Sequence, residues 1–195
     1  MSLELIVPDF GLVWPQFVVF LTAIVLSLAD AFLPKHLHYR WLTAISLVGY
    51  SLGLLLLFGQ NGEDRSTFYG LFRADGLTVF LTLVILAAAI LTVFVSASYI
   101  EHLEGRMPIG EFYTLLAFAV LGSLLTASAG DLVMLFVGIE LSSLATYILT
   151  AFALIFTGAG RLALRIPALE GPKLRMLGVV LAVVGGVGAV LVRNL

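Results

Sequence analysis

Apolar blocks separated by short polar or turn-forming segments run along nearly the whole chain. A helix needs roughly 20 apolar residues to cross a hydrocarbon core about 30 Å thick, and the blocks approach or exceed that length. The pattern therefore predicts an all-α fold, a polytopic transmembrane helix bundle of about six spans. We expect these spans at Leu12–Leu33, Trp41–Phe58, Gly76–Ser98, Phe112–Ala129, Leu132–Thr157 and Met176–Val192.

The pattern also divides the chain into two unequal parts. Residues 1–157 hold the first five predicted spans and are interpreted as one transmembrane domain. Residues 158–195 begin with a basic segment that contains prolines, which we expect to be an amphipathic linker at the membrane surface, and end in a glycine-rich span. Inside the first part, the connection Gly59–Asp75 is rich in polar residues and is interpreted as a solvated loop.

Composition supports an integral membrane protein, because 61% of the residues are hydrophobic, 11% are charged and the mean hydropathy is +1.13. A net charge of -2 gives no reason to expect a nucleic-acid partner. The chain has no cysteine, no phosphate-binding glycine loop and no histidine inside a predicted span. We therefore expect no metal site and no cofactor bound by this chain.

Orientation follows from the basic residues, because cytoplasmic loops of membrane proteins carry an excess of lysine and arginine. With the N-terminus outside, seven of the ten basic residues fall in inside connections and three in outside segments. We expect the N-terminus outside and, with an even number of spans, the C-terminus outside as well. The start of the chain resembles neither a signal peptide nor a transit peptide, which favours a prokaryotic inner membrane.

Glu140 lies inside the fifth predicted span, which with its flanks reads DLVMLFVGIELSSLATYILTAFALIFT. It is nine residues beyond Asp131, so at about 1.5 Å per residue its carboxyl lies roughly 13 Å along the helix, near the bilayer midplane. An ionisable group there costs at least about 2.5 kcal/mol and commonly marks an ion or proton path. Burial favours the neutral acid and a nearby cation favours the carboxylate, so a movable partner would load and release a proton. We predict a catalytic role for Glu140 as a proton relay.

Ser143 and Tyr147 follow Glu140 at spacings of three and seven residues, which places all three on one face of a helix. We predict that the two hydroxyls support Glu140 by hydrogen-bonding it or by ordering a water beside it. Small residues around them are expected to face other helices. Because almost no loop precedes this span, we expect a tight antiparallel pair of the fourth and fifth helices, with Asp131 as the N-cap.

Structural alternatives remain for both intramembrane acids. Glu140 would also be explained as a protonated, hydrogen-bonded acid that only fixes helix packing. Asp30, near the inner end of the first span, is interpreted either as an interfacial ion pair with Lys35 or as part of a proton entry. The only lysines, Lys35 and Lys173, fall in predicted loops, so a cationic partner for Glu140 is expected from another chain.

Three short motifs occur in a characteristic order: EFY at residues 111–113, SAGDL at 128–132 and GIELSSLATYIL at 138–149. With LADAFLP at residues 28–34, they make the chain similar to subunit N of the proton-pumping NADH:quinone oxidoreductase, respiratory complex I. The likeness covers about residues 1–155, and the C-terminal tail departs from it.

The resemblance implies the N-terminal part of an antiporter-like fold. In that family a fifth-helix glutamate pairs with a lysine on a later broken helix, and the GIELSSL match assigns this glutamate to Glu140. The implied partners are the lipid bilayer and other membrane subunits of complex I, with the lysine-bearing half supplied by another chain. NADH, FMN, iron–sulfur clusters and quinone would be bound by other subunits, so this chain would be a translocase subunit without a redox centre.

Two other functions remain open beside that one. The chain is also explained as a truncated or split relative that keeps a structural or assembly role without transporting protons. A third explanation is a subunit of a related cation/proton antiporter or membrane hydrogenase, which shares the fold.

Overall fold

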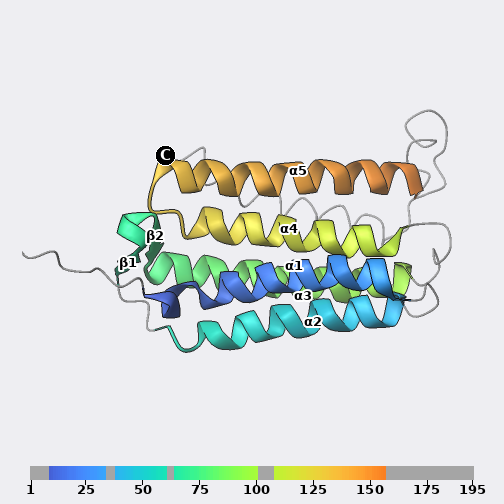
Figure 1. The fold of residues 1–195 in the computed structure, drawn as a ribbon, viewed down its shortest axis with the longest axis horizontal. Helices are drawn as coiled ribbons and strands as arrows, with labels where there is room; N and C mark the ends of the chain where they lie inside the picture. The colour runs from blue at the N-terminus through green and yellow to red at the C-terminus, as the bar shows by residue number, and fades with distance from the viewer. Residues whose placement is uncertain (1–8, 34–37, 61–63, 101–107, 157–195) are drawn as a thin grey trace, which may run out of the picture.

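The computed structural model describes residues 9–33, 38–60, 64–100 and 108–156. Within these ranges five long helices lie side by side along one direction (Figure 1), and each is long and apolar enough to cross a membrane. They are α1 (Trp14–Phe32), α2 (His38–Leu57), α3 (Gly76–Ile100), α4 (Ile109–Ala127) and α5 (Leu132–Phe156). The predicted helical transmembrane bundle is confirmed. The predicted linker and glycine-rich span at 158–195 lie outside the described residues.

The helix ends differ from the predicted spans by up to three residues, for local reasons. A short 3₁₀ turn, Phe10–Val13, precedes α1, and the Asp9 carboxylate caps it by accepting a hydrogen bond of 2.9 Å from the Gly11 N–H. Pro15 then occupies the first turn of α1, where the missing N–H costs nothing. The fourth helix starts at Ile109, three residues earlier than predicted, directly after Pro108.

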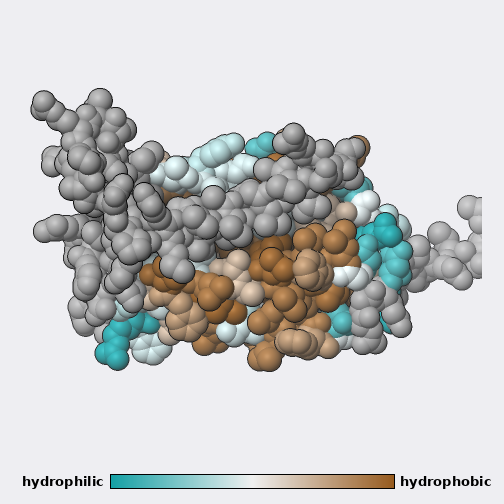
Figure 2. Space-filling model, turned by 180° about the vertical axis from the view of Figure 1, so that it is seen from behind, coloured by the Kyte–Doolittle hydropathy of each residue, from teal (hydrophilic) through white to brown (hydrophobic). Residues whose placement is uncertain are grey.

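The core of the bundle surrounds α4. In the apolar stretch of α4, 72% of residues are buried, against 17% in α5. Helices α1, α2, α3 and α5 all pack against α4, and α5 lies at the edge of the bundle (Figure 1). On the face of the bundle seen in Figure 2, apolar residues gather across the middle and hydrophilic residues lie near the two ends, as expected for a bundle surrounded by lipid. The edge position of α5 leaves much of that helix uncovered.

A β-hairpin occupies most of the connection Gly59–Asp75, which we interpreted as a solvated loop. Much of the hairpin is exposed, as that interpretation predicts, but the segment is folded rather than irregular. Strand β1 (Arg65–Thr67) pairs antiparallel with β2 (Phe72–Ala74), and the turn η3 (Phe68–Gly70) joins them. Phe72 is 1% exposed and forms a bridge with Ala129 in the α4–α5 turn. The Arg73 N–H donates to the Ser128 carbonyl at 2.9 Å, and the Gly130 N–H donates to the Leu71 carbonyl at 2.8 Å. These bonds attach the hairpin to the α4–α5 turn.

Two buried tyrosines in the core provide a matched test of the packing. Tyr113 on α4 shares a hydrogen bond of 2.7 Å with the Thr43 hydroxyl on α2. The hydroxyl of Tyr50 on α2 is buried and has no hydrogen-bond partner among the described residues. We expect Tyr113→Phe to lower the free energy of unfolding by about 1 kcal/mol, because it leaves Thr43 without that partner. Tyr50→Phe should leave it unchanged or raise it, because no bond is lost.

Thermal unfolding of both variants in the same detergent measures this difference. An equal loss of stability in the two variants would contradict the hydrogen-bond assignment.

Candidate functional site

The α4–α5 pair is the closest-packed feature around Glu140. A Cβ atom built on Gly138 would lie 2.7 Å from the Thr126 backbone nitrogen and 3.0 Å from the Gly122 carbonyl oxygen. The Ser123 and Ser142 hydroxyls meet across the same seam at 3.2 Å. Small residues therefore let the two backbones approach closely, as is typical of membrane helices. The predicted tight antiparallel pair is present.

Asp131 begins α5 as predicted. Its Oδ1 atom accepts a hydrogen bond of 2.8 Å from the Met134 N–H, which satisfies one of the free amides in the first turn. Its negative charge also lies at the positive end of the helix dipole. The cap fixes where α5 starts, and so fixes the depth of the residues that follow.

Glu140 lies eight residues beyond the first residue of α5, about 12 Å along the helix axis. Its side chain is exposed on the face of α5 that points away from α4. Val133, Phe136 and Leu144 share that face and are 58% to 66% exposed. A carboxyl at this depth is costly where it faces lipid. We call the set Val133, Phe136, Glu140, Leu144 and Tyr147 the outer α5 face.

The two predicted supporting residues, Ser143 and Tyr147, lie on the same side of α5 as Glu140, as their spacing predicted. Tyr147 is 70% exposed on the outer α5 face, and Ser143 is half-buried beside it. Among the described residues, no hydrogen bond joins either hydroxyl to the Glu140 carboxyl. The supporting roles of Ser143 and Tyr147 stay predictions.

The side chain of Asp30, near the end of α1, lies beside the first turn of α4. Its carboxyl group is half-buried and packs directly against the Cα of Gly110, so that a side chain at position 110 would collide with it. A carboxylate at this position faces the positive end of α4. The expected partner, Lys35, lies outside the described residues. Asp30 and Glu140 lie on different helices, and they do not form one site.

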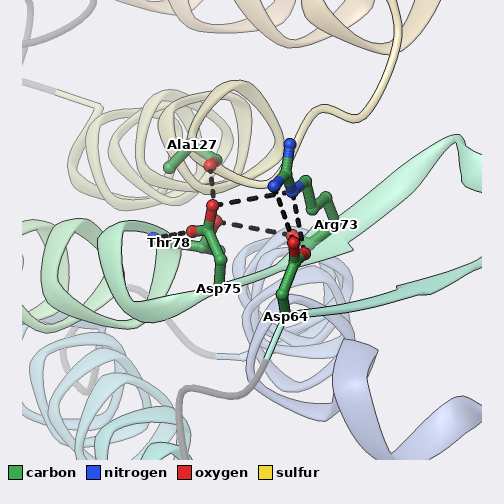
Figure 3. Close-up of polar contacts among 5 residues, drawn as sticks. All are labelled: Asp64, Arg73, Asp75, Thr78 and Ala127. Carbon is green, nitrogen blue, oxygen red and sulfur yellow. Dashed lines mark hydrogen bonds and ion pairs between the residues drawn. The ribbon is translucent and has the colours of Figure 1, made fainter.

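A second polar cluster lies where the hairpin meets α3, and the sequence patterns did not indicate it. Arg73 donates from Nε to Asp64 Oδ1 at 3.0 Å and from a terminal nitrogen to Asp64 Oδ2 at 2.8 Å (Figure 3). The Asp75 carboxylate lies 3.6 Å from Arg73 Nε and caps α3 by accepting from the Thr78 N–H at 2.8 Å. The Thr78 hydroxyl donates to the Ala127 carbonyl on α4 at 3.2 Å. The cluster thereby ties the hairpin, α3 and α4 together at one end of the bundle.

The hydrogen bonds in this cluster also favour the charged forms. The Thr78 backbone N–H, followed by the Thr78 hydroxyl and the charge of Arg73, holds the pKa of Asp75 below its ordinary value against the effect of partial burial. The hydrogen bond and charge of Asp64 raise the pKa of Arg73. The only sequence signal was the order Arg73, Asp75 and Thr78 at the start of a span, which is a capping pattern rather than a functional motif.

Among the described residues, no group of histidine, aspartate and glutamate side chains has the geometry to hold a metal ion. Five membrane-length helices and a mid-depth carboxyl define the class of protein: a polytopic helical membrane protein with an intramembrane acid. No family model matches the chain. Its curated relatives identify it more closely.

The chain is 40% identical over 139 residues to "NADH-quinone oxidoreductase subunit N" of Desulfovibrio desulfuricans, covering 70% of this chain and 26% of that protein. It is 39% identical over 136 residues to the protein of the same name from a Geobacillus species, covering 69% and 27%. A solved chain of "Respiratory complex I from Thermus thermophilus with bound Aureothin" aligns with a TM-score of 0.58 and 25% identity, over 88% of this chain and 42% of that one.

This chain is thus a homologue of NADH-quinone oxidoreductase subunit N, and the resemblance predicted from the sequence is confirmed. It spans about a quarter of the length of the first two relatives. The protein is integral to the membrane.

Proposed function

We propose that this chain forms part of the membrane arm of a proton-translocating NADH:quinone oxidoreductase, and that Glu140 passes protons within it. The single observation that supports the relay is the position of Glu140, a carboxyl about 12 Å into α5 on a face that no other described helix covers. An isolated acid at that depth is favoured in its neutral form, and a cation brought close favours the carboxylate. Movement of a cation toward and away from the outer α5 face therefore releases and reloads one proton at the carboxyl.

In this proposal the hydroxyls of Ser143 and Tyr147 accept that proton or pass it on. Ser143 lies about one turn beyond Glu140 and Tyr147 about two turns beyond it, on the same side of the helix. In this proposal the helix that covers the outer α5 face carries the cation, supplied by a lysine outside the described residues.

Electron transfer from NADH to quinone takes place in other subunits, which bind the nucleotide, FMN, the iron–sulfur clusters and quinone. The proposed location is a prokaryotic inner membrane, with the N-terminus outside and the hairpin on that same outer side. The more basic connections then lie in the cytoplasm.

Purification in mild detergent tests the assignment to this complex. We expect an affinity-tagged chain to migrate on a native gel in a large assembly whose companions include NADH-oxidising and quinone-reducing subunits. Soluble hydrogenase or antiporter subunits among the companions would replace the proposal with one of those relatives. Migration of the chain alone would contradict it.

A further inference from the structure

A groove of about 410 Å³ lies at the hairpin end of the bundle. It is lined by the first turns of α3 and α5 and by the C-terminal end of α4. This volume is within the range of roughly 300 to 1,000 Å³ that small-molecule sites occupy. The groove has a polar end, formed by Arg73, Asp75 and Asp131. It also has an apolar wall, which includes Leu77, Leu81 and Leu135.

The groove lies at the boundary between membrane and water. Asp75 directly precedes α3 and Asp131 directly precedes α5, so the charged end is at the level of the lipid headgroups. Leu81 is five residues into α3, about 7.5 Å deeper, at the level of the acyl chains. Leu77 and Leu132 at the rim are 59% and 82% exposed, so the groove opens sideways toward hydrocarbon. An occupant must therefore be polar at one end and apolar at the other.

The charges at the polar end select the headgroup. Asp64 and Asp75 flank Arg73, and Asp131 lines the same groove, so these four side chains together carry a formal charge of -2 (one minus three). The C-terminal carbonyls of α4, with their partial negative charge, line the same end, and the partial positive ends of α3 and α5 are each offset by a capping carboxylate, Asp75 and Asp131. An anionic headgroup is repelled there, whereas an ammonium group is attracted. Two nitrogens of Arg73 donate to Asp64, but the guanidinium has five N–H donors and the side chain is 53% exposed. Arg73 therefore still presents N–H groups to a phosphate.

We propose that this groove binds a phosphatidylethanolamine molecule. The phosphate lies against Arg73, the primary ammonium donates hydrogen bonds to Asp131 and Asp75, and one acyl chain follows Leu77, Leu81 and Leu135. A quaternary choline headgroup has no N–H to donate and fits less well. A lipid held here would fill the space between the outer ends of α3 and α5. This proposal does not depend on the proton relay.

Native mass spectrometry tests the site. The delipidated protein, together with the subunits that it retains, is titrated with phosphatidylethanolamine, phosphatidylcholine and phosphatidylglycerol that have identical acyl chains. We expect one phosphatidylethanolamine to bind about tenfold more tightly than either of the other two lipids, a difference of about 1.4 kcal/mol. Equal affinity for the three lipids, or preference for phosphatidylglycerol, would overturn the proposal.

Three variants locate the binding. Leu135→Trp fills the groove and should weaken phosphatidylethanolamine binding about tenfold, whereas Leu91→Trp, the same change at a 60% exposed position elsewhere, should not. Asp131→Asn keeps an N-cap side chain of similar strength but removes one negative charge. It should reduce the preference for phosphatidylethanolamine over phosphatidylglycerol without unfolding α5. If Leu135→Trp and Leu91→Trp bind lipid equally, the lipid is not in this groove.

Discussion

With the proposed relay at Glu140, replacing it with glutamine should abolish the protons translocated through this subunit while NADH oxidation by the assembled complex continues. Glutamine keeps the length, the shape and the hydrogen-bonding capacity of the side chain, but it carries no proton that titrates. The expected result is a lower ratio of protons translocated to electrons transferred. Reconstituted vesicles with a pH-sensitive dye, assayed in parallel for NADH oxidation, give that ratio directly.

Glu111→Gln is the matched control for this experiment. Glu111 is an exposed glutamate in the first turn of α4, so the same chemical change is made outside the mid-membrane region. Its expected effect is the loss of a favourable interaction with the helix dipole, about 0.3–1 kcal/mol of stability, with proton translocation unchanged. Tyr147→Phe tests the supporting hydroxyl, and we expect a smaller fall in the ratio than Glu140→Gln gives.

The alternative roles make a different prediction for the same variant. If the chain only supports assembly, Glu140→Gln lowers the amount of complex in the membrane and leaves the ratio per complex intact. An unchanged ratio at normal abundance would remove Glu140 from the proton path altogether. Quantifying the complex beside each assay therefore separates the relay from the structural explanation.

The depth of Glu140 could be predicted from the sequence, but its direction could not. Depth depends only on where α5 begins, and Asp131 marks that point locally through its capping bond. The side of α5 that faces the bundle depends on contacts with residues of α4, which the pattern within α5 alone does not reveal. Gly138 and Ser142 are the residues of α5 that pack against α4. Glu140 is therefore turned outward, although its small neighbours alone suggested a shared buried face.

The hairpin was missed for a similar reason. Its strands are three residues each, too short to give a convincing alternating pattern. They are held by the burial of Phe72 and by hydrogen bonds to Ser128 and Gly130, partners more than fifty residues away. A polar composition correctly indicated an exposed segment but contained no signal for these long-range bonds. The groove beside the hairpin, formed by three helix ends, was beyond prediction for the same reason.

The second large effect is expected from Gly122→Ala, a change of one methyl group in the α4–α5 seam. A Cβ atom at position 122 would lie 2.8 Å from the Gly138 carbonyl oxygen and 2.9 Å from the Ser142 Cα. Both are backbone atoms, so no side-chain rotation relieves the contact and α5 must move as a unit. Forcing extra volume into a packed interior costs about 1–3 kcal/mol. We expect a lower midpoint of thermal unfolding in detergent.

Gly53→Ala provides the control, because Gly53 is also a buried helix glycine. The added methyl there would lie 3.5 Å from a Leu86 methyl group, an ordinary contact. Alanine is favoured over glycine in a helix by roughly 0.5–1 kcal/mol, so Gly53→Ala should be neutral or stabilising. Equal midpoints for the two variants would mean that α4 and α5 are not so close.

Because Glu140 is two residues from Gly138 on the displaced helix, Gly122→Ala should also lower the ratio of protons translocated to electrons transferred, whereas Gly53→Ala should not.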